Sequence, residues 1–295
     1  MPAAPEIKHY KTIVISDTHL GTSGSKAREV VKFLQAHSCD LLLMNGDIID
    51  GWELQRYGNW KRHHTQFMRT IMKMMERQKT RVVDTRGNHD DFLDSVIPLR
   101  IGKRFFIQRE LIYESFGKRY LVTHGDVFDS VTKQMKWIAQ LGSMGYTFLL
   151  WVNKVYNKWR VRQGKPYYSL SSKIKARVKQ AVSYISDFEV KLVDYAKSKK
   201  CDGVICGHIH QPAIKQYGTL QYLNSGDWVE SMTALLEDDN GVWTLYQYVQ
   251  TPDELIQNQA DKVETLLDEE YDEEIDLNTV VDLKTMPGLK PLLGE

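Results

Sequence analysis

The sequence predicts an α/β fold, an αββα sandwich in which helices flank two mixed β-sheets. Short apolar strands alternate with helical patterns over residues 13–83, an order typical of parallel βαβ units. Further strands lie on both sides of a long helical stretch, which favours a second sheet. Apolar residues make up 42% of the chain and charged residues 26%, as in soluble globular proteins.

The N-terminal part contains the elements that predict parallel pairing. Strands are expected at 13–15, 41–44 and 81–83, which are rich in aliphatic residues. Helices are expected at 26–37 and 66–77, where apolar residues recur every three or four positions. The uninterrupted apolar run at 41–44 is typical of a strand that is covered on both faces.

The later elements complete the predicted sandwich. Strands are expected within 105–116 and at 120–123, followed by a helical pattern at 130–160 and a helix at 171–199. The last strands are expected at 203–206, 220–223, 233–236 and 242–248. We therefore predict one domain over residues 1–250, with a helical insert at about 130–168, and an acidic tail over residues 251–295.

The charges are unevenly distributed, although the net charge is only +1. Residues 131–200 contain 15 Lys or Arg and three acidic residues, whereas residues 252–295 contain 13 acidic and three basic residues. The basic stretch is suited to an anionic partner. The acidic stretch is expected to be a solubilising tail, with docking on the basic insert as the alternative.

Cysteine content and hydropathy indicate the cellular compartment in which the protein is expected. The three cysteines have no ligand-like spacing, which favours a reducing compartment over a disulfide framework. Residues 1–10 contain no apolar segment of signal-peptide type. No run approaches the roughly 20 apolar residues that a spanning helix needs. The expected location is the cytoplasm.

Polar motifs follow five of the predicted strands. They are Asp17-x-His19, Gly46-Asp47, Gly87-Asn88-His89-Asp90, His124 and Gly207-His208-x-His210. Taken singly, such residues more often cap helices, form turns or make structural hydrogen bonds. Their occurrence in order at five strand ends is a different matter, because the ligand sites of open α/β sheets lie beyond the carboxyl ends of strands.

The residue types indicate a site for divalent metal ions. First-row metals accept carboxylate, imidazole and amide oxygen ligands together, and one carboxylate can bridge two ions. Asp17 and His19 lie two residues apart on a segment expected to be extended, so their side chains should point the same way. His208 and His210 have the same spacing. Glycines before three of the candidate ligands allow the backbone to approach closely.

The set of motifs resembles that of the calcineurin-like metallophosphoesterase superfamily, D-x-H, G-D, G-N-H-D, H and G-H-x-H, over residues 13–250. The resemblance implies two divalent metal ions with Asp47 as the bridge. One ion would be held by Asp17, His19, Asp47 and His210, and the other by Asp47, Asn88, His124 and His208. His89 would lie beside the phosphate, as a general acid or as a stabiliser of charge.

The implied reaction is hydrolysis without a phosphoenzyme, with Asp47 and His89 as the catalytic residues. Two ions about 4 Å apart lower the pKa of a bridging water towards neutrality and hold the phosphoryl oxygens for in-line attack. Charge that develops on the leaving oxygen is relieved by His89.

Within the superfamily, the chain is most similar to the UDP-2,3-diacylglucosamine pyrophosphatases. The similarity rests on Ser16-Asp17-Thr18-His19-Leu20-Gly21, on Trp52 after the Gly-Asp loop and on an insert after Asp126. It implies hydrolysis to UMP and lipid X in lipid A biosynthesis, with manganese as the ion and iron or zinc as alternatives. His89 replaces the arginine usual in that family, and Gly51-Trp52 lacks the arginine of the Ser/Thr protein phosphatase motif G-D-x-x-D-R-G.

The expected insert carries an apolar stripe with basic residues among and beyond it. Its stripe comprises Trp137, Leu141, Met144, Phe148, Trp151, Val155 and Trp159. In one interpretation the insert is a lid that holds acyl chains and rests on an anionic membrane surface; in the other it is an amphipathic helix pair packed on the core. Substrate contacts are expected from Arg86, Asn224, Trp137, Trp151, Trp159, Arg160 and Arg162. The continuous stripe favours lipid over single-stranded nucleic acid, so no nucleic-acid partner is expected.

The expected partners are therefore a nucleotide-linked glycolipid and the inner-leaflet surface of the inner membrane, which the protein would contact peripherally from the cytoplasm. Two alternatives stay open. The first is another metal-dependent phosphodiesterase or nuclease of the same superfamily. The second is a non-catalytic protein that binds lipid surfaces, because membership of a superfamily does not fix the substrate.

Overall fold

The computed structural model describes residues 7–128, 170–252 and 254. The chain divides into two compact units, Met1–Tyr248 and Val249–Glu295. The first unit contains every named helix and strand of the described residues. The predicted insert lies outside the described residues, as does the predicted tail apart from residues 251, 252 and 254.

The larger sheet has seven strands in the order β12-β11-β1-β2-β3-β5-β4. They are β1 (Lys8–Ile15), β2 (His37–Asn45), β3 (Arg81–Thr85), β4 (Leu99–Ile101), β5 (Phe105–Gln108), β11 (Thr233–Glu237) and β12 (Trp243–Gln247). β1, β2, β3 and β5 run parallel, and the other three strands pair antiparallel. The carboxyl ends of β1, β2 and β3 therefore lie at the same end of the sheet.

The smaller sheet has five strands in the order β6-β7-β8-β10-β9. They are β6 (Glu110–Ser115), β7 (Lys118–Thr123), β8 (Gly203–Cys206), β9 (Ala213–Tyr217) and β10 (Leu220–Asn224). The central strands β7, β8 and β10 run parallel, and the edge strands β6 and β9 are antiparallel to their neighbours. Both sheets are thus mixed, as predicted.

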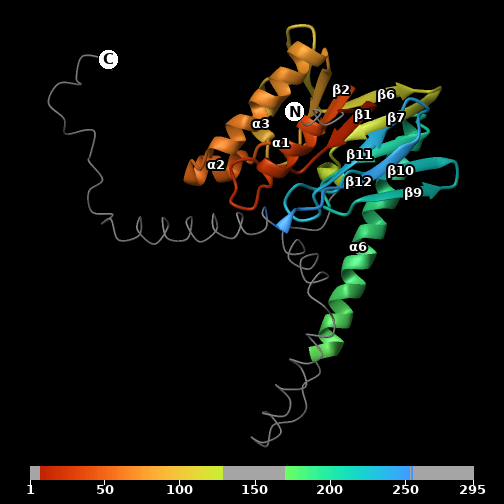
Figure 1. The fold of residues 1–295 in the computed structure, drawn as a ribbon. Coiled ribbons are helices and arrows are strands. Elements are labelled where there is room, and N and C mark those ends of the chain that lie inside the picture. Colours follow the sequence, from red (N-terminus) through yellow and green to blue (C-terminus); the bar gives the residue numbers. More distant parts are fainter. Residues whose placement is uncertain (1–6, 129–169, 253, 255–295) are drawn as a thin grey trace, which may run out of the picture. The chain divides into compact units, whose positions relative to one another are not determined.

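Helices cover the outer face of each sheet (Figure 1). α1 (Ala27–Ala36) and α3 (Arg62–Lys73) pack on the larger sheet, and α6 (Leu170–Ser198) packs on the smaller one. The short helices are α2 (Gly51–Tyr57), the π-helix η1 (Met74–Gln78) and the 3-10 helices η2 (Asp91–Ser95) and η3 (Asp126–Phe128).

Three clusters of buried apolar residues fill the interfaces between these four layers. Successive residues of β1 belong to different clusters, because side chains alternate across a strand. Ile13 and Ile15 pack with α1 and α3, whereas Val14 faces the smaller sheet. Leu121 of β7 packs with Phe188 of α6 on the far side. The predicted αββα sandwich is confirmed.

Some elements differ from the prediction. The segment 105–116 forms two strands in different sheets, β5 and β6, with only Arg109 between them. The helix expected at 66–77 begins at Arg62 and passes into the π-helix at Met74. Helix α2 was not expected, and none of its residues is buried, so its sequence carries no apolar periodicity. The edge strands β4 and β9 were not expected either, and they are largely exposed.

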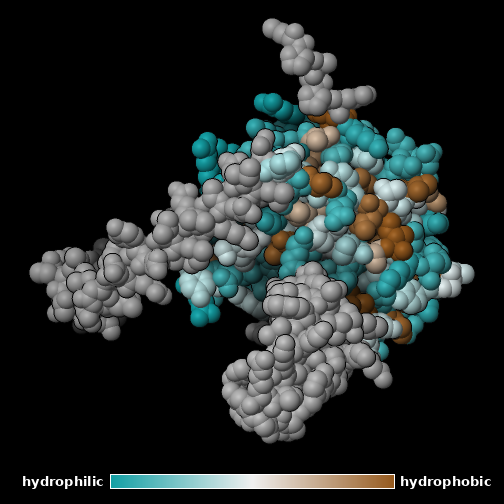
Figure 2. All heavy atoms as spheres, turned by 60° about the horizontal axis from the view of Figure 1, so that its bottom comes forward, coloured by the Kyte–Doolittle hydropathy of each residue, from teal (hydrophilic) through white to brown (hydrophobic). Residues whose placement is uncertain are grey.

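The surface of the described part is mostly polar. No helix of that part is long and apolar enough to cross a membrane. On the face shown in Figure 2, hydrophilic residues surround small groups of apolar ones. The exposed aromatic residues include Trp52, Tyr57, Trp60 and Phe92, which lie in or near α2 and η2.

Candidate metal centre

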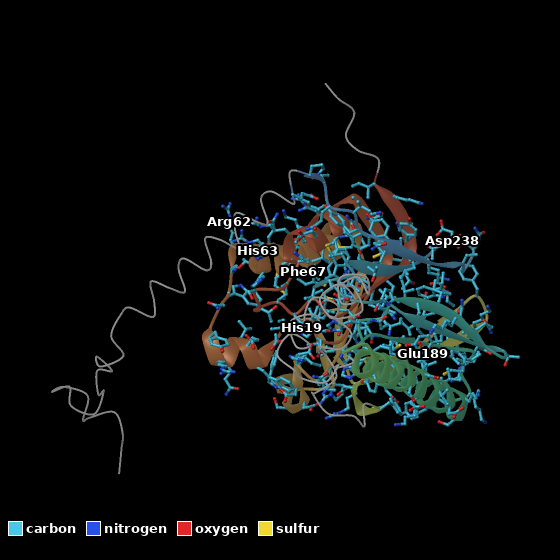
Figure 3. The ribbon with its side chains drawn as sticks, turned by 90° about the horizontal axis from the view of Figure 1, so that it is seen from below. His19, Arg62, His63, Phe67, Glu189 and Asp238 are labelled. Carbon is cyan, nitrogen blue, oxygen red and sulfur yellow. The ribbon has the colours of Figure 1, made fainter. Side chains whose placement is uncertain are left out.

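Every predicted ligand lies in a loop that follows the carboxyl end of a parallel strand. Asp17 and His19 follow β1, Asp47 follows β2 and Asn88 follows β3 in the larger sheet. The smaller sheet supplies the remaining ligands, His124 after β7 and both His208 and His210 after β8. In the view of Figure 3, His19 lies below Phe67 of α3 and to the left of Glu189 of α6. The ligands therefore come from both sheets.

The backbone at these ligands is unusual. Five of the predicted ligands have a positive φ: Asp17 (52°), His19 (44°), Asp47 (52°), His208 (68°) and His210 (54°). Only four other non-glycine residues of the described part share this left-handed conformation. Asp17 and His19 thus do not lie on an extended segment as expected, and their side chains converge through a sharp turn. Such strain is concentrated at functional sites.

Glycines permit the close approach of the loops, as predicted. A Cβ at Gly87 would lie 2.3 Å from Oδ1 of Asp47, and a Cβ at Gly207 would lie 2.5 Å from Oδ2 of Asp17. Both distances are far below contact, so neither position accepts a side chain without displacing a candidate ligand.

Asp17, His19 and His210 form the first group of potential ligands, with one nitrogen or oxygen atom from each lying within 4.8 Å of the others. Oδ1 of Asp17 lies 3.1 Å from Nε2 of His210 and 4.0 Å from Nε2 of His19. Its other oxygen, Oδ2, accepts the backbone N–H of His208 at 3.1 Å. These residues match three of the four ligands expected for the first ion.

Asp47, His124 and His208 form the second group, with the same spread of ligand atoms. Oδ2 of Asp47 lies 3.2 Å from Nε2 of His124 and 3.9 Å from Nε2 of His19. Asp47 therefore faces ligands of both groups, which is the placement that a bridging carboxylate requires. Asn88 lies in the neighbouring loop, and its buried Oδ1 has no hydrogen-bond partner among the described residues.

This donor set fits divalent metal ions. Buried carboxylate and imidazole groups face one another, and a buried amide oxygen lacks a donor, although buried polar atoms in proteins normally have a partner. Nitrogen and oxygen ligands in this combination suit Mn, Fe or Zn. The residues present therefore fit two ions, although they do not distinguish between these metals.

Without metal, the buried groups compensate one another electrostatically. Burial raises the pKa of Asp47, but His124 and His19 lower it to well below its usual range. Burial likewise opposes ionisation of Asp17, yet His210 and His124 lower its pKa to about 2. Burial lowers the pKa of His124, whereas Asp47 and Asp17 together raise it to about 10. A metal ion bound by His124 must therefore displace a proton.

Asp50 connects the metal ligands to His89, a link that the sequence analysis did not identify. Its Oδ2 lies 3.1 Å from Nδ1 of His19 and 2.7 Å from Nδ1 of His89. Its Oδ1 accepts the N–H of Glu53 at 2.9 Å and caps α2. The ring of Trp52 lies 4.4 Å from that of His89. The signal in the sequence was the second aspartate of Gly46-Asp47-Ile48-Ile49-Asp50, at the N-terminus of α2.

The carboxylate of Asp90 shapes the loop that holds Asn88 and His89. It accepts the backbone N–H of Gly87 and that of Ile48. Burial and the nearby Asp47 raise the pKa of Asp90 to about 7. Asp90 thus ties the loop after β3 to the loop after β2, and is not among the candidate metal groups.

Two residues that were expected to contact substrate form ion pairs or hydrogen bonds with other residues of the protein. Arg86 forms ion pairs with Asp94 at 3.0 Å and with Asp126 at 2.5 Å. Asn224 is fully buried, and its Nδ2 donates to the carbonyl oxygen of Gly207 at 3.0 Å. These contacts hold the loops behind the ligands. Trp137, Trp151, Trp159, Arg160 and Arg162 lie outside the described residues.

A family model described as Calcineurin-like phosphoesterase matches residues 10–212. No curated protein matches the chain significantly.

Solved structures similar to the chain include an archaeal phosphodiesterase, with 12% identity, a TM-score of 0.38 and coverage of 80% of this chain and 98% of the other. Yfce, a phosphoesterase from E. coli, has 14% identity and a TM-score of 0.38, with 81% and 99% covered. Vps29 from Entamoeba histolytica, complexed with Zn²⁺, has 12% identity and a TM-score of 0.39, with 80% and 97% covered.

Proposed function

The chain belongs to the calcineurin-like phosphoesterase family, and on that premise we propose that it hydrolyses the pyrophosphate bond of UDP-2,3-diacylglucosamine to UMP and 2,3-diacylglucosamine 1-phosphate. Membership makes the chain a metal-dependent hydrolase, whereas the identity of the ester is the proposal. The observation that carries the phosphoesterase chemistry is the position of Asp47, which faces both groups of ligands.

We assign the metal ligands as the resemblance to the superfamily implies. Asp17, His19, Asp47 and His210 would hold one ion, and Asp47, Asn88, His124 and His208 the other. Manganese is the first candidate, with iron and zinc as alternatives. When bound, two divalent ions supply Lewis acidity to the phosphoryl oxygens and activate the attacking water.

His89 is assigned to the developing charge on the leaving oxygen. Asp50 binds Nδ1 of His89, so Nε2 is the ring nitrogen left to address the substrate. Trp52 lies against the same ring and limits its rotation. A histidine oriented in this way supplies either a proton or positive charge to the leaving group.

An exposed apolar surface beside His89 supports a substrate with an apolar part. Trp52 is 36% exposed and Phe92 is 49% exposed. Phe92 packs against Gly51, the residue before Trp52, because a Cβ at Gly51 would lie 2.7 Å from Cδ1 of Phe92. Exposed aromatic rings next to a phosphate site suit an acyl chain, although they would also stack on a nucleobase. This second possibility favours a nuclease as the rival function.

One assay separates these functions. The purified protein, loaded with manganese, is given UDP-2,3-diacylglucosamine, UDP-sugars without acyl chains, an aryl phosphodiester and single-stranded DNA. Release of UMP from the acylated substrate at a much higher kcat/KM than from the other three supports the proposal. Preferential cleavage of DNA would instead identify a nuclease.

A further outcome concerns the non-catalytic alternative. If no phosphate ester is turned over with manganese, iron or zinc, the protein is better described as a binder of lipid surfaces. We also propose that the substrate is taken from the inner leaflet of the inner membrane. Sedimentation with vesicles that contain anionic lipid, compared with neutral vesicles, tests this partner.

A further inference from the structure

Asn45 ends β2, two residues before Asp47, and its side chain is fully buried between the two sheets. Its amide nitrogen donates to the carbonyl oxygen of Thr123 at 3.2 Å and to that of Ile205 at 3.4 Å. Thr123 is the last residue of β7, and Ile205 lies in β8. One side chain of the larger sheet therefore binds two neighbouring strands of the smaller sheet.

The other polar atoms of Asn45 are also used. Its Oδ1 accepts the hydroxyl of Thr85, the last residue of β3, at 2.6 Å. Asparagine offers two N–H donors and one acceptor in a short side chain, and all of these groups have partners here. Aspartate would place a carboxylate against two carbonyl oxygens, and an aliphatic residue would remove all three of these hydrogen bonds.

The backbone of Asn45 fixes the direction of a candidate ligand. Nδ1 of His124 lies 2.8 Å from the carbonyl oxygen of Asn45, which can only accept a hydrogen bond. Nδ1 therefore carries a proton, and Nε2 lies 3.2 Å from Oδ2 of Asp47. A metal-binding histidine needs one ring nitrogen held in this way, since the bond orients the ring and leaves the other nitrogen for the ion.

We infer that Asn45 is a positioning residue for the second metal ion. Its backbone carbonyl oxygen accepts a hydrogen bond from Nδ1 of His124 and so orients that ring. Its side-chain amide binds β7 and β8 and so fixes the position of these strands relative to Asp47. The inference rests on the proposed two-ion centre. The first group of ligands has a separate link, because Oγ of Ser16 lies 2.7 Å from Oγ of Ser225, in the loop after β10. The strands that the Asn45 side chain binds, β7 and β8, carry His124 and His208 of the second ion but only His210 of the first. Loss of that side chain should therefore weaken the second ion more than the first.

The test compares Asn45→Leu with a second buried hydrogen bond between the sheets. Thr12 of β1 binds the hydroxyl of Tyr113 of β6 at 2.6 Å, and Thr12→Val removes that bond. Metal-free full-length proteins are titrated with Mn²⁺ by calorimetry, and the bound ions are counted after dialysis. Thermal unfolding is measured on the same samples.

Asn45→Leu is expected to bind the second ion about 10–100-fold more weakly, with a smaller loss of affinity for the first ion. Thr12→Val is expected to lose thermal stability and to bind both ions as the unmodified protein does. Thr85→Val, which keeps Asn45 but removes the hydroxyl bound to its Oδ1, should weaken the second ion to a smaller extent. If Asn45→Leu does not fold, Thr85→Val carries the comparison.

Two results contradict the inference in distinguishable ways. If Asn45→Leu binds each ion with the same affinity as the unmodified protein, Asn45 merely stabilises the fold. If only Thr85→Val folds, the same result in that variant has the same meaning. Binding of fewer than two ions by the unmodified protein would overturn the two-ion centre itself, and this inference with it.

Discussion

At the residue scale, Asp50 joins metal binding to the stabilisation of charge. One oxygen atom, Oδ2, lies within hydrogen-bonding distance of both His19 and His89. Burial raises the pKa of Asp50, but the hydrogen bonds to both histidines lower it below the usual range of aspartate. An ionised carboxylate at this position holds both rings with a proton on Nδ1.

The change Asp50→Asn removes this charge with little change of shape. We expect kcat on an aryl phosphodiester to fall about 10–100-fold, as is common when the partner of a metal ligand or catalytic histidine is lost. The count of bound ions should change little, because His19 keeps its place in the first group. Steady-state kinetics over a range of pH, together with metal analysis, give the measurement.

Glu53→Gln is the matched control for that variant. Glu53 lies three residues further on in α2, and only its backbone N–H binds Asp50. Its kinetics should equal those of the unmodified protein. An unchanged kcat in Asp50→Asn would show that His89 needs no partner.

The pKa of His124 gives a prediction about pH. It is raised to about 10 in the metal-free protein, from an ordinary value of 6.5, mainly through Asp47 and Asp17 acting against burial. The resulting stabilisation is complete below pH 6.5 and is lost as the pH rises towards 10. Metal binding displaces that proton, so the affinity for Mn²⁺ should increase over the same interval.

Thermal unfolding of metal-free protein and calorimetric titration with Mn²⁺, both followed between pH 6.5 and 9, check these opposite trends. A stability of the metal-free protein that rises with pH, or an affinity that does not, would show that His124 is neutral before the ion binds.

At the scale of elements, the strand ends place the ligands. These strands could be predicted because each is an apolar run that stops at a polar motif, as at Leu42 to Asp47. Helix α2 could not be predicted, since none of its residues is buried. The segment 105–116 did not reveal its division between the sheets, because a single residue, Arg109, separates the two strands.

The candidate metal ligands were easier to predict than the residues that position them. Asp17 and His210 belong to short motifs with metal-binding residue types, whereas Asn45 looks like one polar residue after an apolar run. Its hydrogen bonds join strands that lie 78 and 160 residues away in the sequence. A local sequence pattern does not predict contacts between residues so far apart in the sequence. The same holds for the left-handed backbone at the ligands, which non-glycine residues adopt only where the surrounding structure imposes it.

Gly87→Ala tests the close approach of the loops after β2 and β3. The added methyl group would lie 2.3 Å from Oδ1 of Asp47, so the loop must move and Asp47 with it. We expect phosphodiesterase activity to fall below about 1% of the original, since misplacement by about 1 Å costs about 100-fold. Gly102→Ala is the control, because no atom lies within 4 Å of the added methyl.

The Gly102 control separates backbone strain from the specific clash. Gly102 has a φ of 63°, so alanine is mildly strained there, but the β4–β5 turn is remote from the motifs that supply the ligands. The control should keep its activity. Full activity in Gly87→Ala would mean that the loops are not packed as described.

At the scale of the whole molecule, the centre joins the two sheets of the sandwich. The larger sheet supplies Asp17, His19, Asp47 and Asn88, and the smaller sheet supplies His124, His208 and His210. Ions bound between them are released when the sheets separate, so metal binding should stabilise the folded state.

Removal of metal should therefore lower the melting temperature. Free ion at 100 times its Kd stabilises a folded protein by about 2.7 kcal/mol for each site. Calorimetric scans with manganese and with a chelator measure the difference. The Asp47→Ala variant should melt at the same temperature in both conditions, which controls for effects of the chelator on the rest of the protein.

The central claim is that Asp47 is shared by two metal ions, and the count of ions in Asp47→Ala tests it most directly. The variant and the unmodified protein are loaded with manganese, dialysed and analysed for metal per folded chain. We predict two ions for the unmodified protein and a loss of both in Asp47→Ala, because Asp47 is a member of both proposed ligand sets. Retention of two ions by the folded variant would contradict the shared carboxylate.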